Sequence, residues 1–224
     1  MPDWSYRTVL RPLFFAMGAE RSRRLSVATL AVLSRLPFGL AFIDFLGHMR
    51  ADARLRRRAG SFEVDTPIAL GSLVDPSGDA AAALARFGTG LLEIGPVGER
   101  AAHTIGASAD VVADVEEVAA NLERQQPPIP ICIRIHGTDP AAARRVAARL
   151  ADHASLFSAE PEVVAAVHGI RPTLSRGRFA AGAAGVWLQN GENIEATRAE
   201  AGRDALIIAG GVCDPEDVRR NLEA

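Results

Sequence analysis

The segment "IALGSLVDPSGDAAAALARFGTGLLEIGPV", from Ile68 to Val97, sets the expected fold. It begins with a short apolar run, passes through a turn of small residues into an alanine-rich amphipathic stretch, and ends in a second apolar run. This order predicts a strand, a turn, a helix and a second strand. Such a unit is typical of a parallel sheet that helices cover.

The same alternation continues along the rest of the chain. Apolar runs predict six strands, at residues 67–70, 91–95, 129–135, 154–158, 185–189 and 205–211. Amphipathic stretches predict helices between them, at residues 79–88, 109–125, 139–153 and 194–202. Asp139 and Asp214 each precede a proline, which is typical of a capped helix start. A closed eight-stranded barrel normally takes about 250 residues. The 164 residues that follow residue 60 of this 224-residue chain therefore predict an α/β fold with a reduced or incomplete TIM-type (β/α) barrel.

The first 60 residues differ from the rest, so we expect two regions, a helical extension over 1–60 and the barrel over 61–224. Residues 4–17 and 19–36 predict two helices joined at Gly18. The second helix carries one apolar face, formed by Leu25, Ala28, Thr29, Val32 and Leu36. Bulky apolar side chains flanked by arginine are typical of helices that lie in a membrane interface. A helical hairpin packed on its own domain explains the same pattern equally well.

The composition excludes several classes of partner and site. The formal net charge is -2, so we expect no nucleic-acid partner. All 25 basic residues are arginine, and the chain therefore has no lysine for a Schiff base or a compact phosphate contact. The five histidines and two cysteines lack metal-ligand spacing, which predicts no metal site. No uncharged span reaches 18 residues, so we expect no membrane-crossing helix.

Seven segments, in chain order, resemble the quinone-dependent (class 2) dihydroorotate dehydrogenases: "LRPLFFAMGAERSRRLSVATLAVLSRLP", "TPIALGSLVD", "ALARFGTGLLEIGPV", "IPICIRIHG", "ADHASLFSAEPE", "AGAAGVWLQNG" and "LIIAGGVCDPEDVRRNLEA". The first is similar to the helical hairpin of that family and the others to its barrel strands and loops. The resemblance implies a flavoprotein that holds FMN, oxidises dihydroorotate to orotate in pyrimidine biosynthesis and passes electrons to a membrane quinone. It also implies that the hairpin lies on the lipid bilayer and forms the quinone tunnel. We therefore expect a cytoplasmic protein, peripheral on the inner face of the cell membrane.

The resemblance assigns the cofactor to five positions. These cofactor-binding residues are Gly71 and Ser72 in the turn after the first strand, Asn190 at the end of the strand 185–189, and Gly210 and Gly211 in the phosphate loop. Backbone N–H groups of a glycine pair between a strand and a helix can bind an anion. A tight turn between strand and helix accounts for the glycine pair equally well. Leu73, Pro76 and Pro96 stand where the family has a glycine, a flavin-contacting lysine and a threonine.

The catalytic loop of the family, Ser-Ser-Pro-Asn, corresponds here to Ala159-Glu160-Pro161-Glu162. Glu160 therefore stands in the place of the serine base, and a carboxylate in a dry pocket can accept a proton. Two carboxylates after a strand are also typical of a solvated helix start. The resemblance further assigns Arg134 and Asn190 to substrate binding, and it places Phe157 at the position of a substrate-binding asparagine.

Two functions from different classes remain open. One is an FMN-dependent oxidoreductase of the dihydroorotate dehydrogenase type. The other is a catalytically inactive family member, or pseudoenzyme, that acts as a binding or assembly subunit. Because the family's last strand has no counterpart in the sequence, we also expect that a partner chain or a second copy completes the barrel.

Overall fold

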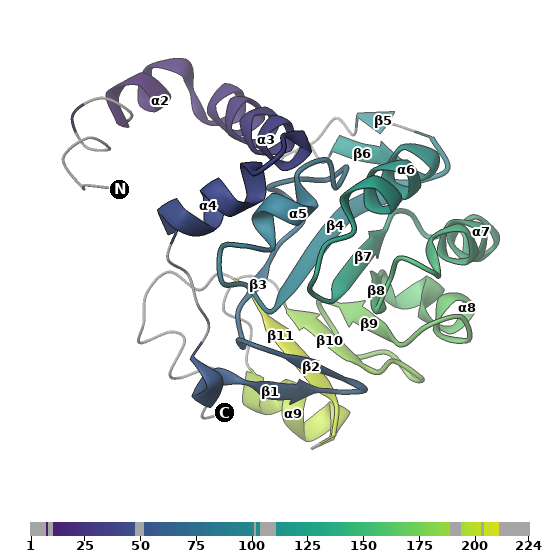
Figure 1. Cartoon of the computed structure of the whole chain (residues 1–224). Coiled ribbons are helices and arrows are strands. Elements are labelled where there is room, and N and C mark those ends of the chain that lie inside the picture. The colour runs from purple at the N-terminus through teal and green to yellow at the C-terminus, as the bar shows by residue number, and fades with distance from the viewer. Residues whose placement is uncertain are drawn as a thin grey trace.

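The computed structural model describes residue 8 and residues 11–47, 52–100, 102–103, 111–188, 194–202 and 204–210. Seven parallel strands form a nearly closed barrel (Figure 1). They are β3 (Ala69–Leu70), β4 (Leu91–Gly98), β7 (Ile131–Ile135), β8 (Leu156–Ala159), β9 (Thr173–Arg176), β10 (Gly185–Leu188) and β11 (Leu206–Ala209). Their order is β3-β4-β7-β8-β9-β10-β11. The predicted reduced β/α barrel is confirmed.

Helices pack on the outer face of the barrel. They are α5 (Ala81–Leu84), α6 (Val115–Gln125), α7 (Pro140–Leu150), α8 (Val164–His168), which follows the 3-10 helix η3 (Pro161–Val163), and α9 (Ile194–Ala201). The main core lies between strands and helices, where Ile94, Ile133 and Phe157 are fully buried. Asp139 caps α7 as predicted, because its carboxylate accepts the N–H groups of Ala141 and Ala142. Asp214 lies outside the described residues.

Three strands, β5, β6 and β9, lie where the sequence predicted no strand. β9 is the fifth strand of the barrel, although its four residues include two hydroxyls and an arginine. The helix predicted over 109–125 is wrong at its beginning, because residues 111–114 form β6 (Val111–Asp114). This strand runs parallel to β4 and antiparallel to β5 (Ala102–His103). The helix begins at Val115, after Asp114, whose carboxylate accepts the N–H of Glu116 at 2.9 Å.

A small hairpin was also not predicted. After the 3-10 helix η2 (Ala53–Leu55), β1 (Arg57–Ala59) pairs antiparallel with β2 (Phe62–Val64). Gly60 has a φ of 61°, a conformation that glycine adopts without strain in such a tight turn. Phe62 packs against the apolar cluster inside the barrel, so the hairpin lies at the end where the strands begin. The hairpin crosses the predicted boundary at residue 60. The division of the chain into a helical extension and a barrel region stays a prediction.

The N-terminal region forms α2 (Arg11–Met17), α3 (Ala19–Arg35) and α4 (Gly39–Gly47), which lie beside the barrel (Figure 1). α2 and α3 meet at Gly18, as predicted. α3 packs on the barrel through Val27, Leu30 and Ala31.

The apolar face predicted for α3 is not the face that packs on the barrel. Leu25, Val32 and Leu36 are 47%, 54% and 52% exposed. Helix α3 therefore has apolar side chains toward the barrel and also away from it. No single helix in the described residues is long and apolar enough to span a bilayer, although α3 and residues 39–45 together reach that hydropathy across a 117° bend.

Candidate site at the barrel mouth

The interior of the barrel is built from the alternate side chains of each strand, because successive residues of a strand point to opposite faces. Part of the interior is an apolar cluster, which begins at the strand starts and reaches the level of Arg176 at Trp187. This cluster consists of Leu91, Cys132, Leu156, Leu174 and Trp187, with Phe62, Ala69, Leu206 and Ile208 packed against it. Two residues further along three of these strands come Glu93, Ser158 and Arg176. On β8 and β9 these polar side chains lie toward the carboxyl ends of the strands, where barrel enzymes hold their ligands, whereas Glu93 is the third of the eight residues of β4.

Glu93 is the centre of this polar layer and is 2% exposed. Its Oε1 accepts hydrogen bonds from Arg176 Nη1 at 2.5 Å and from Ser158 Oγ at 2.8 Å. Its Oε2 accepts the backbone N–H of Ser72 at 3.2 Å. The Glu93 carboxylate is thus hydrogen-bonded to β8, to the end of β9 and to the turn that follows β3.

Arg176 supplies a buried positive charge at the end of β9. It is 7% exposed, and its guanidinium lies over the Trp187 ring, with the guanidinium carbon 5.6 Å from the ring centroid. Its Nε is buried and has no hydrogen-bond partner among the described residues. Burial and the nearby Glu93 carboxylate raise the pKa of the Cys132 thiol, so this thiol stays protonated at neutral pH.

The turn after β3 keeps the small residues that the sequence singled out. Ser72 is buried, and Gly71 is partly buried. A Cβ placed on Gly71 would meet no heavy atom of the described residues within 4 Å. The turn therefore leaves space beside Gly71 while its backbone is fixed through the bond from Ser72 to Glu93.

The structure places the predicted base and its neighbour at the end of β8. Glu160 follows β8 directly, precedes η3 and is partly buried. Its side chain does not cap the helix. Glu162 is exposed and forms an ion pair with Arg178 at 3.2 Å. Arg134 is partly buried on β7, and Ser158 is its partner in the register of β8.

The remaining predicted residues fall at or beyond the limits of the described chain. Gly210 follows β11, and its N–H donates to the carbonyl of Leu188 at 2.9 Å. Asn190 and Gly211 lie outside the described residues. Phe157 does not face the interior, because its side chain belongs to the core between strands and helices.

Sequence reasoning missed Glu93, Ser158 and Arg176, which the structure brings together. A usable signal was present for Glu93, since a single carboxylate inside the apolar run 91–95 requires a buried partner. No signal pointed to Arg176, because the segment that contains it was not recognised as a strand.

A cavity of about 310 Å³ lies between the N-terminal half of α3 and the barrel, beside their packed contact. Arg23 and Arg24 of α3 lie on one side, and Asp75 and Asp79 of the turn before α5 lie on the other. Asp75 is buried and accepts the N–H groups of Asp79 and Ala80. Burial raises the pKa of this carboxyl group despite these bonds.

Comparison with known proteins identifies relatives over part of the chain. No family model matches it. A dihydroorotate dehydrogenase (quinone) from Acidithiobacillus ferrooxidans is 36% identical over 94 residues, and one from Deinococcus deserti is 35% identical over 92 residues. Each match covers 41% of this chain and 25% of the relative. The chain thus matches about a quarter of the length of these curated relatives.

Comparison with solved structures extends over most of the chain. The crystal structure of a dihydroorotate dehydrogenase from Eimeria tenella in complex with ferulenol superposes with a TM-score of 0.68 and 12% sequence identity. The match covers 91% of this chain and 83% of that chain. This protein is therefore a distant homologue of the quinone-dependent dihydroorotate dehydrogenases over about 41% of its length, and it has the dihydroorotate dehydrogenase fold.

Proposed function

We propose that this chain binds FMN at the barrel mouth and acts as a flavin-dependent oxidoreductase of the dihydroorotate dehydrogenase type. The observation that carries the proposal is the buried Arg176–Glu93 pair, which joins a cation to the small-residue turn at Gly71 and Ser72. Homology to enzymes that are dihydroorotate dehydrogenases of the quinone type supports the same reaction class.

The residues present fit the ring of a flavin. Open space beside Gly71 would admit a flat ring next to the backbone. The buried Nε of Arg176 has a free N–H, and a bound acceptor atom would satisfy it. Gly210, at the end of β11, lies where the resemblance puts the phosphate loop. We therefore assign Gly71, Ser72 and Arg176 to the ring and the segment that begins at Gly210 to the phosphate.

Conversion of dihydroorotate to orotate breaks two C–H bonds, and one hydrogen leaves as a hydride and the other as a proton. FMN, when bound, supplies the hydride acceptor. Glu160 is the base that this chain offers for the proton, because it directly follows β8 and is partly buried. Arg134, which is partly buried on β7 and in register with Ser158 of β8, is the cation that the resemblance assigns to the anionic substrate.

The N-terminal helices are assigned to the membrane and to the electron acceptor. Their outer apolar side chains, among them Phe15 at 75% and Phe38 at 87% exposure, suit the interfacial layer of a bilayer. We propose that the protein lies on the inner face of the cell membrane. The cavity between α3 and the barrel is the place we assign to a quinone headgroup.

Flavin binding is tested with purified protein and added FMN. The wild type is expected to retain FMN through gel filtration and to show the flavin absorbance bands. Gly71→Leu fills the space beside the turn and is expected to abolish retention. Gly169→Leu is the matched control, because Gly169 also has open space at its Cβ but lies on the connection after α8. Colourless wild-type protein, or equal retention by Gly71→Leu, would overturn flavin binding.

Catalysis is tested separately with the flavin-loaded protein, dihydroorotate and a short-chain quinone. Glu160→Ala is expected to lower kcat about a hundredfold or more, as loss of a general base does. Glu162→Gln is the control and is expected to keep the wild-type rate, because Glu162 is paired on the surface with Arg178. Unchanged turnover in Glu160→Ala would exclude its role as the base.

A catalytically inactive binding or assembly subunit is the second candidate. One observation favours it, since Leu73, Pro76 and Pro96 stand where the family has a glycine, a flavin-contacting lysine and a threonine. In this case folded protein does not retain FMN, and a partner chain or a second copy completes the barrel. Light scattering of the purified chain, alone and in cell extract fractions, distinguishes a self-association from a mixed complex.

A further inference from the structure

We propose that Arg23 is a positioning residue that couples the N-terminal half of α3 to the turn after β3, which carries Gly71 and Ser72. The contact is a hydrogen bond in which Arg23 Nη1 donates to the carbonyl oxygen of Val74 at 2.9 Å. It joins two residues that are 51 positions apart in the chain. The effect of this contact on a cofactor rests on the flavin site proposed above, whereas its effect on the turn does not.

Glu20 holds the Arg23 side chain in the orientation that this bond requires. Arg23 Nε and Nη2 donate to the two carboxylate oxygens of Glu20, both at 2.9 Å. Two parallel bonds of this kind fix the plane of a guanidinium group. The buried carboxylate of Asp75 attracts the same guanidinium. The guanidinium is therefore preorganised, and its bond to Val74 costs little side-chain entropy.

The N-terminal half of α3 is held on the barrel less firmly than the rest of the helix. The C-terminal half is fixed by Ala31, which is buried in the core, and by Arg35, which pairs with the turn before α5. Residues 19–26 include no buried side chain and border the cavity of about 310 Å³. Among the described residues, the bond from Arg23 is the one hydrogen bond between 19–26 and the barrel. This half of α3 therefore has a docked and a lifted arrangement, and the bond favours the docked one.

The turn after β3 carries the position of α3 to the mouth of the barrel. Val74 lies three residues after Gly71, and its own N–H donates to the Gly71 carbonyl at 3.4 Å. Between them, the N–H of Ser72 donates to Glu93 at 3.2 Å. This segment is thus anchored from inside the barrel by Glu93 and from outside by Arg23. Loss of the outer anchor frees one side of the turn, so the space beside Gly71 depends on the docked helix.

The contact between Arg23 and the turn acts in both directions, because coupling between two sites is reciprocal. A ligand that fixes the turn also stabilises the docked helix, and a molecule that lifts the helix loosens the turn. Arg23 of the helix and Asp75 of the turn both line the cavity of about 310 Å³, so a molecule that enters it acts on the contact directly. The contact therefore links occupancy of this cavity to the geometry of the flavin turn.

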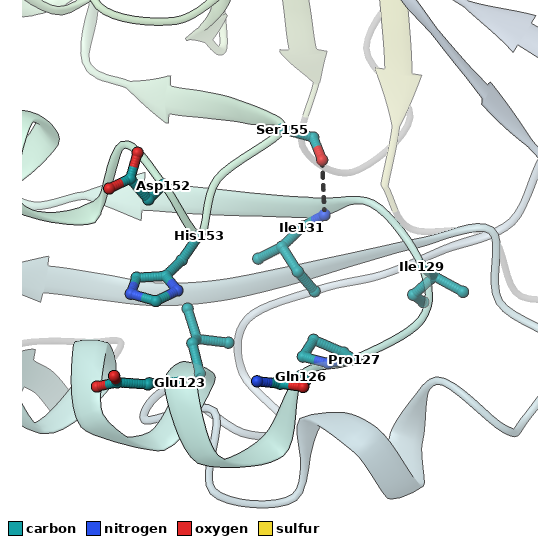
Figure 2. Close-up of a pocket in the computed structure, with 9 residues that line it drawn as sticks. Glu123, Gln126, Pro127, Ile129, Ile131, Asp152, His153 and Ser155 are labelled. Carbon is teal, nitrogen blue, oxygen red and sulfur yellow. Dashed lines mark hydrogen bonds between the residues drawn. The ribbon is translucent and has the colours of Figure 1, made fainter.

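The test is amide hydrogen exchange of the folded full chain without ligand. Arg23→Met removes the donor and is expected to speed exchange at Ser72 and Val74 about fivefold, the effect of one lost hydrogen bond. The amide of Ile131 is the internal reference. It donates to Ser155 Oγ at 3.4 Å beside a separate cavity of about 340 Å³, where the strands begin (Figure 2), and its exchange is expected to stay unchanged.

Arg24→Met is the matched control variant. Arg24 is the next residue of the same helix and forms an ion pair with the same Glu20 at 2.6 Å, but it makes no hydrogen bond to the turn. It is expected to leave exchange in the turn as in the wild type. Equal acceleration by both variants would assign the effect to the charge of the helix and overturn the proposal. Exchange in Arg23→Met equal to that of the wild type would overturn it as well.

The link to the cofactor is measured with added FMN. FMN is expected to slow exchange at residues 19–26 in the wild type but not in Arg23→Met, and to bind about fivefold more weakly to Arg23→Met than to Arg24→Met. Equal affinity of these two variants would refute the link to the ring site. If neither they nor the wild type bind FMN, the proposed flavin site is wrong, and exchange in the ligand-free chain still decides the coupling of helix and turn.

Discussion

Arg176 and Glu93 are 83 residues apart in the chain and form an ion pair at 2.5 Å inside the barrel. Both side chains are more than nine-tenths buried. The pair connects β9 to β4, which are not neighbours in the sheet, across the interior. Its carboxylate also holds Ser158 and the turn at Ser72, so one buried charge fixes the geometry of the mouth.

Removal of one partner of this pair is expected to destabilise the protein more than removal of both. Glu93→Leu leaves a buried guanidinium without a counter-charge, and such a change costs about 3–5 kcal/mol. The double variant Glu93→Leu/Arg176→Leu removes both charges and is expected to lose less stability than either single variant. Urea unfolding of the wild type, the two single variants and the double variant measures the coupling free energy between the two side chains.

The exposed pair Arg149–Glu116 provides the matched control. Its atoms lie 2.8 Å apart, but its side chains are 47% and 66% exposed. The same cycle at this pair is expected to give at most about 1 kcal/mol. A coupling between Glu93 and Arg176 no larger than this value would contradict a structural role for the buried pair.

Gly185 is expected to tolerate no side chain. A Cβ at this position would lie 1.9 Å from the carbonyl oxygen of Leu206 on the neighbouring strand. Gly185→Ala therefore has to push β10 from β11, and we expect a loss of about 2 kcal/mol or more in the free energy of unfolding. Gly169→Ala is the control, since its Cβ would meet open space, and an equal loss there would show that the strand contact is not the cause.

The sequence was sufficient to predict the barrel and its helices, because the strands with apolar residues on both faces are also the strands packed between helices and interior. Phe157 and Ile133 illustrate this pattern. β9 was not predicted, because three of its four residues, Thr173, Ser175 and Arg176, are polar although they are buried. Their burial depends on neighbouring strands and leaves no periodic signal in the segment itself.

The candidate site was predictable only where it follows a strand end. Gly71, Ser72 and Glu160 were assigned through the resemblance and do lie directly after strands, whereas Arg134 lies within β7, and the roles of all four stay predictions. The pairing of Glu93 with Arg176 was not predicted, because contacts across the barrel depend on the closure of the sheet. The sequence also did not show that α3 has a second apolar side, formed by Val27, Leu30 and Ala31, which packs on the barrel.

Asp79 is expected to hold α3 on the barrel. Its carboxylate accepts hydrogen bonds from Arg35 of α3 and from Arg124 of α6, the latter at 3.2 Å. Asp79→Ala removes both bonds and is expected to speed amide hydrogen exchange in the C-terminal half of α3 severalfold, whereas exchange in α7 stays unchanged. Exchange in α3 equal to that of the wild type would show that apolar packing alone fixes the helix.

Stability is expected to fall in acid partly through Glu20. Hydrogen bonds from Arg23 and Arg24 lower the pKa of this carboxyl group from 4.5 to about 2. Because the pKa is lower in the folded state, its contribution is complete above 4.5 and is lost as the pH falls toward about 2. The difference in unfolding free energy between wild type and Glu20→Gln is expected to shrink across this window.

The Asp75 carboxyl group is expected to contribute to stability with the opposite dependence on pH. Burial raises its pKa in the folded state, so the folded chain holds this proton more tightly than the unfolded chain does. Its contribution is present at low pH and is lost as the pH rises through the folded-state pKa. A pH series with Asp75→Asn, read against the Glu20→Gln series, separates the two signs, and parallel profiles for both variants would contradict the assignment.

Membrane association is expected to depend on Phe38, which connects α3 to α4 and is 87% exposed. Its φ of 66° lies in the left-handed region, which asparagine adopts more easily than phenylalanine. Phe38→Asn is therefore expected to keep or raise stability while it removes an exposed aromatic ring. Burial of one such ring is worth about 1.5–3 kcal/mol, so partition onto vesicles of phosphatidylcholine and phosphatidylglycerol is expected to fall about tenfold or more.

Leu55→Asn is the control, because Leu55 is exposed on η2, near the end of the barrel where the strands begin. Sedimentation with vesicles measures both variants. If Phe38→Asn partitions like the wild type, or if Leu55→Asn loses as much, the helices do not form the membrane-facing surface.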